Sequence, residues 1–135
     1  MASFNKFNSF TEALAEKVHN LGSDTLKIAL TNVAPVATNT VLANITEISY
    51  TNLSSRTVTV TASSQTSGTY KLVASDLVLT ASGTVPTFRY AVLYNDTATN
   101  DELIAWWDRG TSVDLISTDT FTVDFDPTNG VLQIA

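Results

Sequence analysis

Beyond residue 23 the chain alternates apolar and polar side chains with a period of two, and this pattern constrains the fold more than any other feature. Leu26, Ile28 and Leu30 alternate with Thr25, Lys27 and Ala29. Successive side chains of a β-strand point to opposite faces of a sheet, so this spacing predicts strands with one buried and one solvated face. The expected strands are residues 26–30, 57–61, 71–73, 77–80, 88–94, 103–107, 120–125 and 131–134.

Short turn signals separate these segments, at residues 66–68, 82–83, 108–110 and 127–130. Many short strands joined by tight turns are typical of antiparallel β architectures. We therefore expect a mainly β chain, an antiparallel β-sandwich or jelly-roll-like domain of about eight short strands with one N-terminal α-helix. Residues 31–40 lack the alternation and are expected to form an ordered connection.

The first 22 residues follow a helical pattern instead. One helical stripe would carry the apolar residues Phe10, Leu14, Val18 and Leu21. Ser9 and Glu12 have the spacing of a capping box, and Gly22 stands where a glycine would end a helix of about three turns. These signals divide the chain into an N-terminal arm and helix, residues 1–22, and a single β-sandwich domain, residues 23–135.

The composition excludes several kinds of chemistry. The chain has no cysteine, one histidine and 22 threonines, so disulfides, thiolate metal sites and histidine clusters are ruled out. Threonine favours strands and keeps their outer faces polar without adding charge. The net charge of −6 argues against binding to nucleic acid or to an anionic membrane. Isolated glycines and the absence of a phosphate-binding loop imply no nucleotide cofactor.

Three candidate sites for chemistry lack a complete signature. His19, the single imidazole, lacks a nucleophile signature and fits the C-terminal end of the helix, so no catalytic residue is assigned. Asp124 and Asp126 begin a calcium-like string, but its glycine is one place late and Ala135 stands where the bidentate glutamate belongs. The loop 95–102 has oxygen ligands without a coordination pattern. We therefore assign no metal, no cofactor and no enzymatic activity.

Aromatic residues are the candidate partner-binding residues: Phe4, Phe7, Phe10, Trp106 and Trp107. The three phenylalanines either cover the chain's own core or reach onto a neighbouring subunit. Adjacent tryptophans on a strand point to opposite faces, which predicts one core tryptophan and one that packs under a loop or in an interface. The alternative is a sugar-stacking platform formed by Trp106 and Trp107 with Phe88, Tyr90 and Tyr94 on the neighbouring strand.

Several phrases of the sequence resemble small virion structural proteins of tailed bacteriophages. They are residues 4–17 (FNKFNSFTEALAEK), 26–32 (LKIALTN), 34–36 (APV), 82–86 (SGTVP), 89–96 (RYAVLYND), 120–124 (TFTVD) and 129–131 (NGV). These phrases extend over most of the chain, and within this group the chain is most similar to capsid decoration, or cement, proteins.

The resemblance implies a non-enzymatic protein that binds the outer surface of a phage head across the seams between capsid subunits and stabilises it. The implied partner is the major capsid protein, and a homo-oligomer, a dimer or trimer, is expected. The implied location is the virion, after synthesis in the host cytoplasm, with no secretion signal or membrane span. A tail, baseplate or head-to-tail component and a carbohydrate-binding β-sandwich module are the alternatives.

Overall fold

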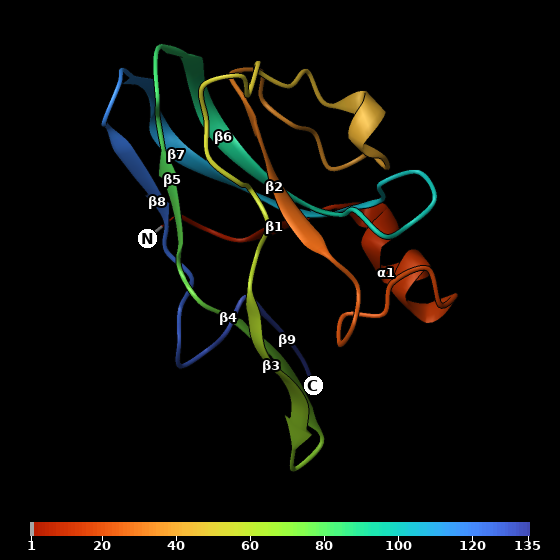
Figure 1. The fold of residues 1–135 in the computed structure, drawn as a ribbon. Coiled ribbons are helices and arrows are strands. Elements are labelled where there is room, and N and C mark those ends of the chain that lie inside the picture. Colours follow the sequence, from red (N-terminus) through yellow and green to blue (C-terminus); the bar gives the residue numbers. More distant parts are fainter. Residues whose placement is uncertain (1) are drawn as a thin grey trace.

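Antiparallel strands dominate the structure (Figure 1). The computed structural model describes residues 2–135. Along these residues the elements are β1 (Asn5–Lys6), α1 (Asn8–Ala15), β2 (Leu26–Thr31), η1 (Leu42–Asn44), β3 (Val60–Thr66), β4 (Thr69–Ala74), β5 (Leu77–Thr80), β6 (Val85–Asn95), β7 (Leu103–Leu115), β8 (Thr120–Val123) and β9 (Leu132–Ile134). Every pairing between these strands is antiparallel. The prediction of a mainly β, antiparallel chain with an N-terminal helix is confirmed.

The strands form three sheets. A four-stranded sheet has the order β1-β7-β6-β2, a three-stranded sheet has the order β3-β4-β9, and β5 pairs with β8. The side chains of all three sheets meet in one main core, which includes Ile28, Leu72, Leu79 and Phe88. Burial of these apolar surfaces is the principal force that holds the sheets together.

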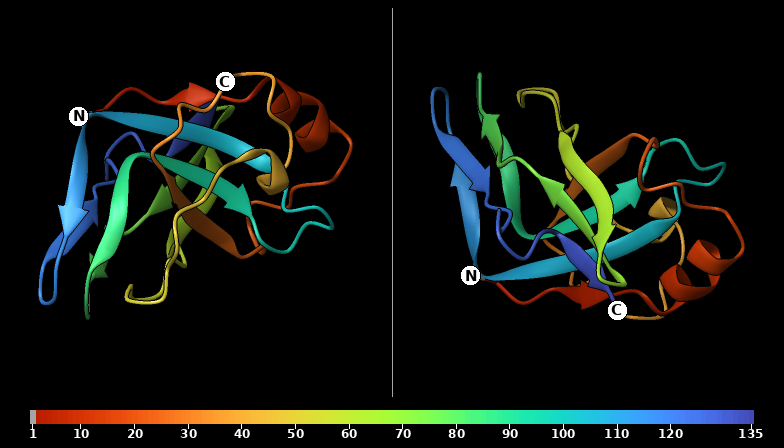
Figure 2. Two further views of the ribbon diagram at one scale, coloured as in Figure 1. Left: turned by 90° about the horizontal axis from the view of Figure 1, so that it is seen from above. Right: turned by 90° about the horizontal axis from the view of Figure 1, so that it is seen from below.

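β6 and β7 extend beyond the predicted segments 88–94 and 103–107, because a bulge bends β7 and lets it stay paired with β6. Tyr90 faces Asp108 and Phe88 faces Val113, so four residues of β7, 109–112, lie opposite Arg89 alone. Gly110 supplies a φ of +93° within this bulge, a conformation that glycine adopts without steric cost. The predicted turn at 108–110 is therefore wrong, since β7 bends there and continues (Figure 2).

The helix is shorter than predicted and is capped differently. It begins after Phe7 with no side-chain cap, so the Ser9–Glu12 capping box is not formed. It ends well before Gly22, because Lys17 adopts a φ of +67°. The N–H groups of Lys17 and Val18 then donate to the carbonyls of Leu14 and Ala13 at 3.3 and 2.9 Å, the pattern of a Schellman motif.

Both faces of the four-stranded sheet carry buried apolar clusters, which differs from the half-buried strands expected. One face belongs to the main core, and a second apolar cluster on the opposite face contains Phe7, Ala29, Ile45 and Val92. The segments that cover this second face are the end of the N-terminal arm and the connection between β2 and β3. Their cover explains why Ala29, at a position expected to be solvated, is fully buried.

The β3–β4 hairpin projects from the body of the molecule (Figure 1). The expected turn at residues 66–68 is confirmed, and its central residues Ser67 and Gly68 both have positive φ, 51° and 85°. This is the backbone of a two-residue type I′ turn, whose twist matches that of the paired strands. The exposed tip of the hairpin is built from serine, threonine and glutamine.

Candidate functional site

A cleft of about 220 Å³ lies where the bent β6–β7 pair approaches β8. Aromatic side chains form much of its lining, and we call it the aromatic cleft. Its lining includes Phe88, Arg89, Tyr90, Trp107, Arg109, Phe121, Asp124 and Phe125, together with Ala2 of the N-terminal arm. The bulge in β7 positions the cleft, because it turns the second half of the strand toward β8.

The N-terminal arm pairs with the part of β7 that carries the two tryptophans. Asn5 of β1 lies opposite Trp106 in the strand register. Phe4 and Phe7, which flank β1, reach opposite faces of the sheet. Phe7 packs on Trp106 with ring centroids 4.6 Å apart, and Phe4 meets the edge of Trp107 at 5.7 Å. As predicted, the adjacent tryptophans occupy opposite faces.

The five candidate partner-binding aromatics divide by accessibility. Phe7 and Phe10 are buried at 0% and 4% exposure, inside the chain's own apolar clusters. Phe4 is 39% exposed, and Trp106 and Trp107 are half-buried. A partner could therefore touch Phe4 and the outer edges of the tryptophans without rearranging the core, whereas Phe7 and Phe10 are held within this chain.

Arginines border the aromatic cleft. Arg89 donates two hydrogen bonds to the Asp108 carboxylate, from Nε at 2.7 Å and from Nη2 at 2.9 Å. This pairing raises the pKa of Arg89, and the same hydrogen bond lowers the pKa of Asp108. Arg109 bonds only to Thr111 of its own strand among the described residues, so its charge remains presented to solvent. Aromatic and arginine side chains together are typical of the residues that dominate binding energy at protein interfaces.

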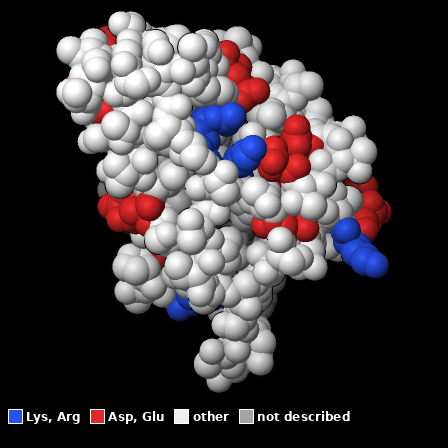
Figure 3. Space-filling model, in the orientation of Figure 1, with Lys and Arg blue, Asp and Glu red and all other residues white. Residues whose placement is uncertain are grey.

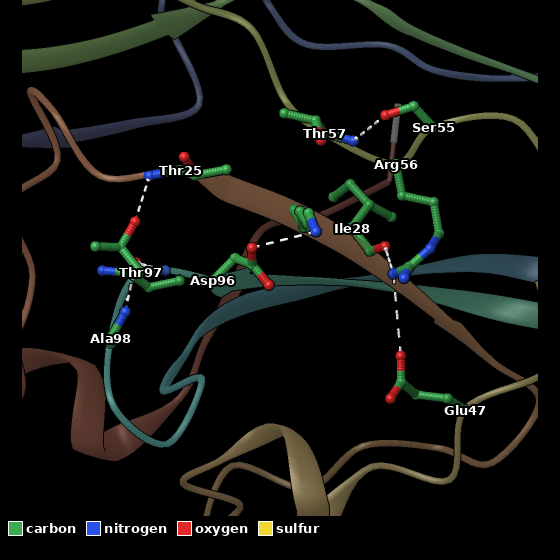
Figure 4. A network of polar contacts seen from close by, with 11 residues as sticks. Thr25, Ile28, Glu47, Ser55, Arg56, Thr57, Asp96, Thr97 and Ala98 are labelled. Atoms are coloured by element: carbon green, nitrogen blue, oxygen red, sulfur yellow. Dashed lines mark hydrogen bonds and ion pairs between the residues drawn. The ribbon is translucent and has the colours of Figure 1, made fainter.

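A second polar cluster lies beside β2, where basic and acidic side chains gather on an otherwise largely uncharged face (Figure 3). Arg56 Nη1 donates to the carbonyl oxygen of Ile28 at 2.7 Å (Figure 4). The Arg56 guanidinium also lies 3.6 Å from the centre of the Tyr50 ring. The Glu47 carboxylate is 4.0 Å from Arg56 and accepts the Tyr50 hydroxyl at 2.8 Å. Burial raises the pKa of Tyr50, which keeps its hydroxyl protonated.

This cluster fastens the connection between β2 and β3 to the sheet. Two further contacts join β2 to the loop after β6: Lys27 forms an ion pair with Asp96 at 3.2 Å, and the hydroxyl of Thr97 accepts the N–H of Thr25 at 2.8 Å (Figure 4). The arginine, the tyrosine and the carboxylate are occupied with one another and with backbone groups. We therefore interpret the cluster as structural.

His19 contacts a buried amide instead of a serine. Its Nδ1 lies 3.0 Å from the Asn95 amide nitrogen, which also donates to the Asp24 carboxylate at 2.7 Å. Because the amide is the donor in both contacts, Nδ1 must be the acceptor, and the imidazole is neutral with its proton on Nε2. Burial lowers the pKa of His19, opposed by the charges of Glu102 and Asp24. This arrangement holds the segment after α1 against the end of β6.

The remaining candidate residues perform local structural roles. Asp126 accepts the backbone N–H groups of Thr128 and Asn129 at 2.8 and 2.9 Å. These bonds lower the pKa of Asp126 and stabilise the turn before β9. Within residues 2–135, no three histidine or acidic side chains come close enough together to hold a metal ion. Burial raises the pKa of Asp101 in the loop 95–102.

Sequence reasoning identified Trp107 but missed Arg109, Phe121 and Phe125 as its neighbours in the cleft. Phe125 lies 6.1 Å from Trp107 between ring centres, and these two residues come from different sheets or their extensions. The spacing of apolar residues reports which face of a strand is buried, and it does not report which strands meet.

Comparisons with known proteins give no identification: no family model, no curated protein and no solved structure matches this chain. Within the described residues, none of the helices has the length and apolar character needed to cross a membrane.

Proposed function

We propose that this protein is a non-enzymatic structural protein of a phage virion, a decoration or cement protein on the outer surface of the capsid. One structural observation supports the proposal best: the half-exposed Phe4–Trp107 pair at the arginine-bordered aromatic cleft. Partly exposed aromatics beside arginines suit an adhesive contact. Only 15% of the chain's residues are charged, so a contact beyond these arginines would have few charges to desolvate. The sequence resemblance supplies the capsid as the partner.

We also infer that the sheets pack as a β-sandwich of jelly-roll-like type. The support is the main core, in which side chains of the four-stranded sheet meet Leu72 of β4 and Leu79 of β5. A sandwich with a helix and an arm at one end would present the arm and the aromatic cleft on its outside.

The proposed mechanism is linkage between binding and assembly. A protein that binds the assembled shell, and not its separate subunits, stabilises the shell by its binding free energy. Many copies on one shell multiply a modest contribution from each. The net charge of −6 favours the outer face over contact with packaged DNA.

The test is co-sedimentation of the purified protein with assembled heads and, separately, with dissociated capsid subunits. We expect binding to heads only, and Phe4→Ala should weaken it at least about tenfold, the effect of losing about 1.4 kcal/mol at an interface anchor. Val33→Ala, at an exposed apolar residue outside the aromatic cleft, is the control and should bind normally. Absence of binding to heads, or density for the protein only in the tail by cryo-electron microscopy, would overturn the proposal.

A carbohydrate-binding module is the second candidate, because Tyr90 and Trp107 line the same cleft. An aromatic ring beside a tyrosine could stack on a sugar. The test is a glycan array with wild type, Trp107→Ala and the matched control Trp106→Ala, since Trp106 lies on the opposite face of the strand. Sugar binding that depends on Trp107 and not on Trp106 would support this function, and no binding to any glycan would reject it.

A further inference from the structure

We infer that the outer edge of β3 is a self-association site, at which a second copy of this chain adds its own β3 in antiparallel orientation. This inference does not depend on the proposed function. It rests on which backbone groups β3 leaves unused, on the absence of charge along the strand, and on the symmetry of the pair that results.

The pairing register shows which β3 groups point away from the hairpin. The two-residue turn makes Thr66 and Thr69 a hydrogen-bonded pair, and such pairs alternate along an antiparallel ladder. Ser64 therefore bonds to β4, whereas the N–H and C=O groups of Ser63 and Gln65 face outward. The carbonyl of Leu72, which lies opposite Ser63, accepts from Val131 on the far side of β4 at 2.7 Å, and this confirms the alternation.

β3 also lacks the features that normally prevent edge-to-edge pairing. Its residues Val60–Thr66 include no charged side chain and no proline, and the turn end of the hairpin projects from the body (Figures 1 and 3). The half-buried Ser63 side chain lies beside Gly22. Natural edge strands are usually protected by lysine, proline, a bulge or a covering segment. The single irregularity of β3 lies at its start, between Val60 and Ala62, so it leaves the outer part of the strand able to pair.

A second copy of the same chain is the occupant that the strand fits. In an antiparallel pair of β3 strands, Ser63 of each copy would bond to Gln65 of the other, and the two Ser64 residues would face each other across a two-fold axis. Such an interface is isologous and closed. Two copies that each carry a net charge of −6 repel one another, and β3 brings hydroxyl and amide groups together where a charged edge would add to that repulsion.

The register can be tested with single cysteines, because the chain has none of its own. In the proposed pair the Ser64 Cα atoms lie about 4.5 Å apart, the spacing of a non-hydrogen-bonded pair, which a disulfide can bridge. Ser64→Cys should therefore give a covalent dimer under mild oxidation. Ala62→Cys is the matched control on the same strand and face, since the two copies of residue 62 would be about 13 Å apart. Equal cross-linking of both variants, or none in Ser64→Cys, would overturn the inference.

A second pair of variants removes one outward donor without relying on cysteine. Ser63→Pro deletes the outward N–H, and an edge strand tolerates proline at such a position. Ser63→Ala is its control, because both variants lose the hydroxyl contact to Tyr70 at 2.8 Å and only the proline loses the N–H. Sedimentation velocity over a concentration series should show self-association of wild type and Ser63→Ala and monomeric Ser63→Pro, with folding of each checked by circular dichroism. Identical sedimentation of folded Ser63→Pro and Ser63→Ala would contradict the inference.

Discussion

The strands β2 and β3 each lie at the outer edge of a sheet, but only the edge of β2 is hydrogen-bonded to another segment of the chain. The outer edge of β2 is covered by the connection that follows it: Ile28 N–H donates to the carbonyl of Arg56 at 3.0 Å, and Val58 N–H donates to the carbonyl of Leu26 at 2.9 Å. Among the described residues, no other segment forms a backbone hydrogen bond to the outward N–H and C=O groups of Ser63 and Gln65 in β3. The difference shows how one chain can close one sheet edge internally and leave another without backbone pairing.

The side chains of the two strands match this difference. β2 is buried over most of its length, with charged groups confined to the cluster around Arg56. β3 is mostly exposed and carries hydroxyl and amide groups without charge. The next four experiments measure how much the segments packed against the four-stranded sheet contribute to the free energy of unfolding. The last of them measures the contribution of the turn in the β3–β4 hairpin.

The largest effect is expected from Phe7→Ala, which removes the anchor of the N-terminal arm. Phe7 is fully buried against Trp106, and its N–H donates to the carbonyl of Ile104 at 3.2 Å. Loss of a buried phenylalanine should lower the free energy of unfolding by about 3–5 kcal/mol in a denaturant titration. Phe4→Ala, which truncates a partly exposed ring, should cost less than about 1.5 kcal/mol. Equal losses in the two variants would show that the arm is not anchored at Phe7.

Arg56→Ala should open the cover of β2 and destabilise the chain by about 2–3 kcal/mol, the size of a charge-assisted hydrogen bond together with a cation–π contact. The variant loses the bond to the Ile28 carbonyl and the stacking on Tyr50. Arg109→Ala is the control, because that arginine contacts only Thr111 in the described chain. Its free energy of unfolding should change by less than about 0.5 kcal/mol. Similar values for both arginines would contradict a specific role for Arg56.

Acidification should lower the free energy of unfolding, because protonation of His19 disrupts its contact with Asn95. Burial lowers the pKa of His19 below its ordinary value of 6.5, so the unfolded chain takes up a proton before the folded chain does. The free energy of unfolding should therefore be constant above about pH 6.5 and fall as the pH drops below it. His19→Gln should flatten this dependence until the carboxylates begin to titrate. An unchanged pH profile in His19→Gln would assign the effect to other groups.

The smallest effect is expected at the tip of the β3–β4 hairpin. Ser67 holds a positive φ of 51° in the type I′ turn, a conformation that asparagine tolerates better than serine. Ser67→Asn should raise the free energy of unfolding by about 0.5 kcal/mol without altering the open edge. A thermal melt measures the change, and a loss of stability would indicate that the turn differs from the one described.

The local pattern of the sequence predicted the strand content well. Residues 77–80 match β5 at both ends, and the turn at 66–68 was identified from its serine and glycine. Both features depend on neighbouring residues, so local propensity is sufficient to find them. β1 was missed because two residues carry no periodic signal.

Features set by tertiary contacts could not be read from the sequence in the same way. A bulge let β7 continue through Asp108 and Gly110, where a turn was expected. The cover over Ala29 comes from distant segments, so this residue is buried against the alternation. In the candidate site, Trp107 could be predicted as a contact residue, but its meeting with Phe125 depends on how the sheets pack.

The contrast between a closed β2 edge and an open β3 edge is measured most directly by amide hydrogen exchange at different protein concentrations. In dilute protein, the amides of Ser63 and Gln65 should exchange rapidly, and the amide of Ile28 should be protected by its bond to Arg56. As the concentration rises, the Ser63 and Gln65 amides should slow together while Ile28 is unchanged. Protection of Ser63 and Gln65 in the most dilute sample, or rapid exchange at every concentration, would contradict an open edge that pairs with a second copy.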